Sequence, residues 1–131
     1  MSVFSAAQLA YLGERRLARI ATVGADGTPH VTPVGMWSHN PVHDSIDVTG
    51  REFARSKKYR DVARAAQAAI VIDDLASTDP WRPRGIEIRG RAETVTDPHE
   101  LIRIHPDRVI AWGLDEWNTA AGSPIPALRP L

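Results

Sequence analysis

Hydrophobic and polar residues alternate with a period of two along much of the chain, which is the pattern of strands that bury one face. Asp26 and Gly27 supply a turn of the kind that joins antiparallel neighbours. Gly90 lies in the middle of the longest alternating run, where it predicts a bend. The pattern predicts about seven strands, in residues 17–23, 28–37, 45–49, 69–73, 85–95, 101–105 and 108–112.

Two segments have a helical period of three to four residues. Ser5 and Gln8 have the spacing of a capping box, which predicts one short N-terminal helix. Residues 51–68 form the longer helical segment, with Ser56 as its N-cap. Its apolar face is predicted to consist of Tyr59, Val62, Ala63 and Ala66.

Two other segments lack either period. Residues 74–84 are polar and contain two prolines, so we expect a loop, and residues 113–131 form an irregular, proline-rich C-terminal tail. The chain of 131 residues has an ordinary globular composition and the size of a single domain, 1–131. We therefore expect a mostly β fold, a small antiparallel barrel with a short N-terminal helix and one longer helix at its mouth.

Composition excludes several classes of protein. Cysteine is absent, so there is no disulfide framework and no thiolate nucleophile. The N-terminus has no leader pattern, and no apolar run is long enough to cross a membrane, so we expect a soluble, cytoplasmic protein without a membrane partner. The high ratio of arginine to lysine and the abundant alanine suggest a bacterial source with a GC-rich genome.

The overall charge is zero, but the basic residues are unevenly distributed. Residues 51–64 contain six basic residues against two acidic ones, including Arg55 and the only lysines of the chain, Lys57 and Lys58. If Ser56 caps the helix, both lysines lie in its first turn, where the helix dipole disfavours cations. An anion bound there would reverse that penalty, so the cluster predicts a phosphate site.

Residues 33–37 have the composition of a surface for a flat ring. The segment combines a proline without an N–H, a glycine without a side chain, and two large polarizable groups. An ordinary barrel strand with a core tryptophan remains the alternative. Thr49 and Gly50 end the next strand just before the basic helix, where they could face the same anion. The candidate ring-binding residues are Pro33, Val34, Gly35, Met36 and Trp37.

Other chemistry is not indicated. The five histidines lack the spacing of a helical metal site, so we expect no metal. The nucleophile-elbow, dinucleotide and P-loop motifs are absent, and no residue is assigned a catalytic role. A small barrel that binds nucleic acid needs aromatic and basic residues interleaved on strands, whereas the basic cluster here is helical.

The order of these segments resembles the pyridoxamine-phosphate-oxidase-like superfamily of flavin-binding split barrels. Within it, the chain is most similar to the actinobacterial reductases that depend on the deazaflavin coenzyme F-420. The similar segments are LARIATVGADGTPHVTPVGMW, DVTG, SKKYRDVARAAQAAIVI, GIEIRGRAE and IRIHPDRVIAWGL. The superfamily's phosphate oxidases have an Arg-Lys pair where this chain has two lysines, and the tail lacks their substrate-binding segment. Oxidation of pyridoxamine phosphate is therefore not expected.

The resemblance implies a homodimer of split barrels with cofactor sites at the interface. Lys57, Lys58 and Thr49 would hold the cofactor phosphate, and residues 33–37 would line the ring. Trp81 and Trp112 would close the partner's site. The resemblance implies an oxidoreductase that transfers hydride to an electron-poor small molecule, such as an activated alkene or quinone. The local charge favours F-420 over flavin mononucleotide (FMN); an FMN-dependent reductase or oxidase and a non-catalytic cofactor-binding protein remain alternatives.

Overall fold

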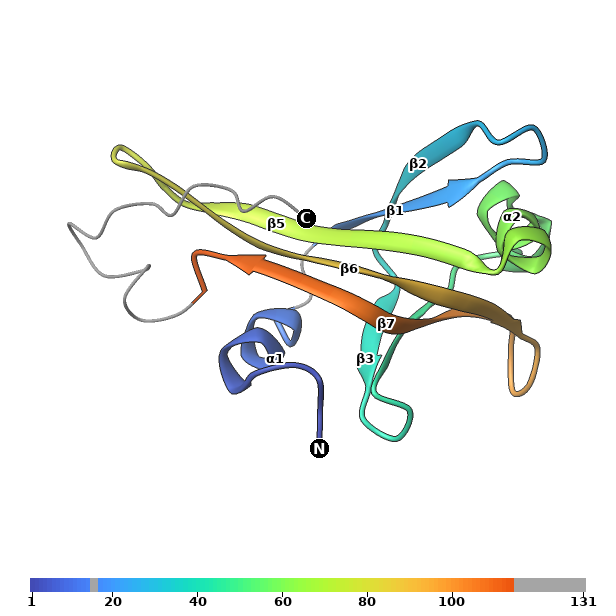
Figure 1. The fold of residues 1–131 in the computed structure, drawn as a ribbon, viewed down its shortest axis with the longest axis horizontal. Coiled ribbons are helices and arrows are strands. Elements are labelled where there is room, and N and C mark those ends of the chain that lie inside the picture. Colours follow the sequence, from blue (N-terminus) through green and yellow to red (C-terminus); the bar gives the residue numbers. More distant parts are fainter. Residues whose placement is uncertain (15–16, 115–131) are drawn as a thin grey trace.

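The computed structural model describes residues 1–14 and 17–114, and this part of the chain is mostly β. Figure 1 shows long strands crossing the molecule, with α2 at one end and α1 beside the sheet. The elements are α1 (Ala6–Leu12), β1 (Ala18–Val23), β2 (Pro29–Val34), β3 (Trp37–Asn40), β4 (Ser45–Val48), the 3-10 helix η1 (Phe53–Arg55), α2 (Lys57–Ala65), β5 (Gln67–Thr78), β6 (Trp81–Val95) and β7 (Leu101–Trp112).

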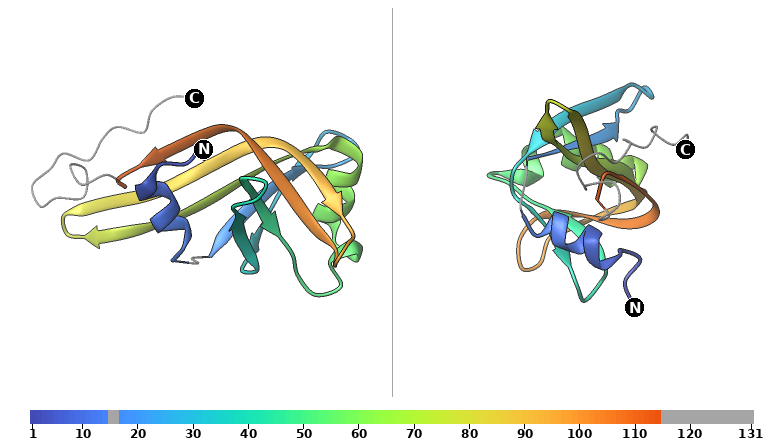
Figure 2. Two further views of the ribbon diagram at one scale, coloured as in Figure 1. Left: turned by 90° about the horizontal axis from the view of Figure 1, so that it is seen from below. Right: turned by 90° about the vertical axis from the view of Figure 1, so that its left-hand side faces the viewer.

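The seven strands form one antiparallel sheet in the order β2-β1-β5-β6-β7-β4-β3. Strands β2 and β3 are therefore the two edges, although only Gly35 and Met36 separate them along the chain. The sheet must curl to bring its edges together at this link, and both views in Figure 2 show that curl. The curled sheet with two helices confirms the predicted antiparallel split barrel.

The inner face of the sheet is packed mainly with isoleucine. Branching at Cβ suits these side chains to a pleated surface, and alternation along each strand sends them all to one side. On β1, Ala18, Ile20 and Thr22 point inward, while the alternate face is at least partly exposed. The fully buried isoleucines are Ile20, Ile46, Ile70, Ile72, Ile86, Ile88, Ile102 and Ile104.

The prediction of a loop at 74–84 was wrong, because β5 and β6 continue as a long two-stranded ribbon. Asp74 pairs in register with Arg84, whose guanidinium donates to both carboxylate oxygens at 2.8 and 3.1 Å. The Tyr11 hydroxyl of α1 donates to the same carboxylate at 2.8 Å. Cross-strand pairing and this ion pair stabilise a segment whose polar composition indicated a loop.

Two other strand boundaries differ from those predicted. Residues 28–37 do not form one strand, because the chain leaves one sheet edge at Val34 and joins the other at Trp37. Residues 101–105 and 108–112 instead form the single strand β7. A register shift opposite Gly90 accommodates the proline within β7. A Cβ at Gly90 would lie 1.8 Å from the His105 carbonyl oxygen, so this close approach requires glycine.

The longer helix is shorter than predicted. Residues 53–55 form η1, and α2 ends at Ala65, followed by Ala66 in the left-handed conformation with φ of 57°. Tyr59 and Val62 are buried as expected, whereas Ala63 and Ala66 are exposed. The buried face includes Asp61 instead, because α2 packs on β1 through a polar contact described below.

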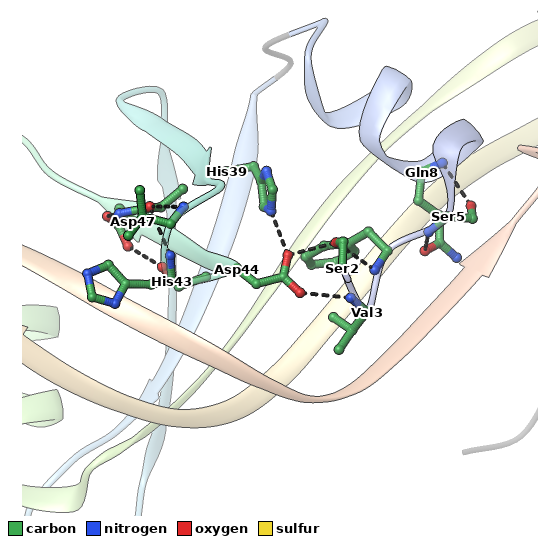
Figure 3. A network of polar contacts seen from close by, with 12 residues as sticks. Ser2, Val3, Ser5, Gln8, His39, His43, Asp44 and Asp47 are labelled. Carbon is green, nitrogen blue, oxygen red and sulfur yellow. Dashed lines mark hydrogen bonds and ion pairs between the residues drawn. The ribbon is translucent and has the colours of Figure 1, made fainter.

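The N-terminal arm is fastened to the turn between β3 and β4. Asp44 accepts hydrogen bonds from the Ser2 hydroxyl and the Val3 N–H, both at 2.7 Å, and lies 2.8 Å from His39 Nε2 (Figure 3). Burial alone would raise the pKa of Asp44, but the bonds from His39, Ser2 and Val3 hold it below its ordinary value. The predicted capping box of Ser5 at the start of α1 is present.

The predictions about metal sites, membrane spans and the C-terminal tail concern the whole chain, whereas the structure describes residues 1–14 and 17–114. Within them, no group of three or more histidine and acidic side chains could hold a metal ion. None of the helices in this described part has the length and apolar character needed to span a membrane. Most of the predicted tail, residues 115–131, lies outside the described residues.

Candidate functional site

The start of α2 is built by Ser56 as predicted. Its hydroxyl accepts from the Tyr59 N–H at 3.3 Å and donates to the Phe53 carbonyl at 2.7 Å, which joins η1 to α2. The N–H groups of Lys57 and Lys58 occupy the first positions of the helix, where no intrahelical acceptor exists. Two backbone donors and two lysine residues therefore lie in the first turn of α2.

Lys57 is engaged by a carboxylate in the same helix. Its Nζ lies 3.3 Å from Oδ1 of Asp61, whose side chain is only 1% exposed. The other oxygen of Asp61 accepts from the Thr22 hydroxyl of β1 at 2.9 Å, and Arg64 lies 3.4 Å from Oδ1. Arg64 also donates to the Val23 carbonyl at 2.8 Å. This group, the Asp61 cluster, attaches α2 to β1.

The pKa of Asp61 reflects two opposing effects. Burial raises it, while the hydrogen bonds from Thr22, Lys57 and Arg64 lower it by more. The net pKa lies below the ordinary aspartate value, so the buried side chain is a carboxylate at neutral pH. A buried carboxylate needs such donors, because desolvation without them is costly.

Lys58 has different surroundings. Its Nζ lies 5.5 Å from the centroid of the Phe53 ring, in cation–π geometry. The ring is buried and meets Tyr59 edge to face at 5.6 Å. A Cβ at Gly50 would lie 3.2 Å from Cδ1 of Phe53, so the glycine allows the ring to pack against the end of β4. Gly50 thus contributes to this site through packing.

A cavity of about 330 Å³ gathers three of the predicted ring- and phosphate-site residues, Met36, Trp37 and Thr49. The Thr49 N–H donates to the Met36 carbonyl at 2.8 Å, and the Thr49 hydroxyl donates to the Glu100 carbonyl at 2.8 Å. His99, on the turn before β7, also lines the cavity. The remaining lining residues are Ser38, Asp47 and Leu101.

Residues 33–37 connect the two edges of the sheet, and this segment contains both buried and exposed residues. Val34 and Trp37 are buried, whereas Pro33, Gly35 and Met36 are exposed. A Cβ at Gly35 would meet no atom within 4 Å, so the backbone there is open on its outer side. The segment therefore offers bare backbone beside a thioether side chain, next to the cavity.

One wall of the cavity is fixed by a nearly buried ion pair. Arg103 donates to both oxygens of Asp47, at 3.1 and 3.2 Å, and Asn40 and Ser45 donate to the same carboxylate at 2.9 and 2.8 Å. Burial raises the pKa of Asp47, but these donors lower it by more, so that it lies below its ordinary value. The pair keeps β4 and β7 in register beside the cavity.

None of the other predicted site residues lines this cavity, and three of them have surroundings of their own. Arg55 is exposed and forms a surface ion pair with Glu52 at 3.1 Å. Trp81 is at the tip of the β5–β6 ribbon, at the opposite end of the molecule from α2 (Figure 1). Trp112 packs over Gly85 and lines a small cavity of about 180 Å³ with residues of α1. One chain therefore does not bring either tryptophan to the lysines.

Sequence reasoning missed two residues of the site. Asp61 was counted only as one of two acids in a basic segment, although its spacing of four residues from Lys57 and three from Arg64 indicated ion pairs on one face of the helix. His99 was considered only as a metal ligand. A larger cavity of about 560 Å³ lies where β1 separates from β5, between Ala21 and Ala69, and contains none of the predicted site residues.

Comparison with known proteins finds a matching family model and a related reductase. The family model described as pyridoxamine 5'-phosphate oxidase matches residues 4–127. The chain is 37% identical over 121 residues to a 5a,11a-dehydrotetracycline/5a,11a-dehydrooxytetracycline reductase of Streptomyces rimosus, covering 86% of this chain and 84% of that protein.

Solved structures share the fold at lower identity. A conserved hypothetical protein of Mycobacterium tuberculosis is 21% identical, with a TM-score of 0.70 and coverage of 98% of this chain and 94% of the other. An F420 reductase is 20% identical, with a TM-score of 0.62 and coverage of 76% and 93%. A FAD-binding protein of Mycobacterium smegmatis is 20% identical, with a TM-score of 0.60 and coverage of 85% and 96%. The chain therefore belongs to the pyridoxamine 5'-phosphate oxidase family of split barrels.

Proposed function

We propose that this protein is a reductase that delivers hydride from reduced coenzyme F-420 to an electron-poor small molecule. The observation that carries the proposal is the continuity between two surfaces. The cavity with Met36, Trp37 and Thr49 lies at the end of β4, and the chain then runs through η1 into the cationic start of α2. A molecule with a flat ring and a phosphate group is complementary to this pair of surfaces.

The residues present fit such a cofactor. The open backbone at Gly35 allows a ring to approach closely, and Met36 supplies a polarizable surface beside it. Lys58 and the free N–H groups of α2 supply donors for a phosphate. Reduced F-420, when bound, supplies the hydride. The chain then has to orient the ring and exclude water, which agrees with the lack of a predicted nucleophile.

The reductase relative supports the class of acceptor. It is named for dehydro compounds, in which a reductase saturates a double bond, and the alignment covers most of both chains. We propose that this protein likewise acts on an alkene conjugated with a carbonyl group, or on a related quinone. Such acceptors accept hydride at carbon because the carbonyl group stabilises the negative charge that results, and a proton from solvent then completes the reduction.

The charge around α2 supports F-420 over FMN. F-420 carries a phosphodiester and a tail with several carboxylates, whereas FMN carries one phosphate. Arg51 and Arg60 are exposed, and within residues 1–14 and 17–114 no acidic side chain lies at ion-pair distance from either of them or from Lys58. Arg55 contributes less than expected, because Glu52 pairs with it. A more anionic ligand uses these free cations better.

A homodimer would complete the site. Trp81 is 58% exposed at the end of a ribbon that extends far from its own α2 (Figure 1). We propose that this tryptophan covers the cofactor of the partner protomer. Replacement of Trp81 by Ala should weaken cofactor binding while leaving the melting temperature unchanged. Unchanged affinity of Trp81→Ala for the cofactor would contradict this part of the proposal. So would a protein that light scattering shows to be a monomer and that binds the cofactor as tightly as a dimer does.

The first experiment is a fluorescence titration of the purified protein with F-420 and, separately, with FMN. We expect saturable binding of F-420 and, with reduced F-420 present, reduction of a conjugated enone that can be followed by absorbance. Tight FMN binding without a response to F-420 would favour an FMN-dependent reductase or oxidase of the same fold. Tight binding of F-420 without turnover of any acceptor would favour a non-catalytic binding protein.

A further inference from the structure

The two adjacent lysines of α2 point to different neighbours. Lys57 Nζ contacts the buried carboxylate of Asp61 at 3.3 Å, and the side chain of Lys57 is about half exposed. Lys58 Nζ lies over the Phe53 ring, 5.5 Å from its centroid. Successive residues of a helix project about 100° apart, so adjacent lysines face different surroundings. The two lysines are adjacent and identical in the sequence, but their ammonium groups contact different partners in the structure.

The contacts of Lys57 belong to the packing of α2 on the barrel. Asp61 is 1% exposed and also accepts from Thr22 of β1. Its negative charge is compensated by Lys57 and by Arg64, the latter at 3.4 Å. Removal of one cation leaves the buried carboxylate less compensated, which destabilises the folded state. The ammonium group of Lys57 thus already has an anionic partner within the protein.

The contacts of Lys58 leave its ammonium group available. A cation–π contact orients the ammonium but uses none of its hydrogen-bond donors in a strong bond. In the described part of the chain, no carboxylate lies within ion-pair distance of Lys58. The ring that carries it packs on Gly50, the residue that follows Thr49 at the cavity. Phe53 therefore links Lys58 to Gly50, the neighbour of the cavity-lining residue Thr49.

We propose that the lysines divide two roles: Lys58, positioned by Phe53, binds the phosphate of the cofactor, and Lys57 compensates Asp61 and fixes α2 on β1. This inference rests on the proposed function for the role of Lys58, whereas the role of Lys57 follows from the chain alone. The expected consequence is a separation of binding from stability between two neighbouring residues of the same type.

The test compares Lys57→Met with Lys58→Met, which both remove the charge and keep the aliphatic stem. The readouts are the dissociation constant for F-420, from fluorescence, and the melting temperature without ligand. Lys58→Met should weaken binding by about tenfold or more, because a charge-assisted hydrogen bond is lost. Its melting temperature should stay within about 2 °C of that of the wild type.

Lys57→Met should show the opposite pattern. Its melting temperature should fall by about 3–8 °C, and its affinity at a temperature where it is folded should change by less than about threefold. Lys57→Arg should restore most of the stability. An equal or greater loss of affinity in Lys57→Met, or full affinity in Lys58→Met, would overturn the division. A wild type that binds neither F-420 nor FMN would instead refute the proposed function, and the two melting temperatures would still test Lys57.

Discussion

The ion pair of Asp47 and Arg103 should be a major contributor to stability, and Asp47→Asn tests this. The carboxylate accepts four hydrogen bonds, two of them from the Arg103 guanidinium, and the two side chains are only 14% and 16% exposed. The amide of Asn keeps the shape but turns an NH₂ group toward donors. The guanidinium is then left without its charge partner in a nearly buried place.

The magnitude follows from burial and from the number of donors. Loss of one partner of a buried charge pair costs about 3–5 kcal/mol, and the remaining exposure of this pair lowers the expected value to about 2–4 kcal/mol. For a domain of this size, that corresponds to a fall in melting temperature of roughly 8–15 °C. Urea unfolding followed by circular dichroism measures the free energy of unfolding directly.

Asp73→Asn is the matched control. Asp73 pairs with Arg19 at 2.9 Å, a similar distance, but these side chains are 46% and 48% exposed. An exposed pair of this kind contributes less than about 1 kcal/mol. If Asp47→Asn and Asp73→Asn lower the free energy of unfolding equally, burial does not decide the contribution of these pairs, and the reasoning fails.

Three further predictions concern pH and two glycines. The pKa values of Asp47 and Asp61 are lowered in the folded state, so their contribution to the free energy of unfolding is complete above the ordinary aspartate pKa of 3.8 and is lost as pH falls through the lowered values. The midpoint of urea unfolding should therefore be constant near neutrality and fall in acid. Asp47→Asn should make that fall smaller. Gly90→Ala should cost at least about 3 kcal/mol in the same assay, because its Cβ would overlap the His105 carbonyl, and near-wild-type stability would contradict this. Gly35→Ala should leave the melting temperature unchanged, because its Cβ meets no atom, and should weaken F-420 binding in a fluorescence titration if a ring lies on this backbone; unchanged affinity would place the ring elsewhere.

Local sequence patterns were sufficient for most of the elements. Alternation located the strands because the inward positions of a half-buried strand must be apolar, and the isoleucines of β5, β6 and β7 occupy those positions. Ser56 was identifiable as an N-cap because its hydroxyl satisfies a donor three residues along. The ribbon of residues 74–84 could not be identified from local patterns. Its strands are stabilised by cross-strand pairing and by Tyr11, which lies far from them in the sequence.

The sequence by itself determined the β-rich fold, the cap of α2, the basic cluster and the candidate ring-binding segment, since each depends on neighbouring residues. Only the tertiary structure decided how these parts act together. It brought Met36 and Thr49 into one cavity, buried Asp61 against Thr22, and gave Lys57 and Lys58 different partners. It also placed Trp81, the first residue of β6, at the opposite end of the molecule from α2. These features depend on the curl of the sheet and on how α2 packs across it, which no local pattern specifies.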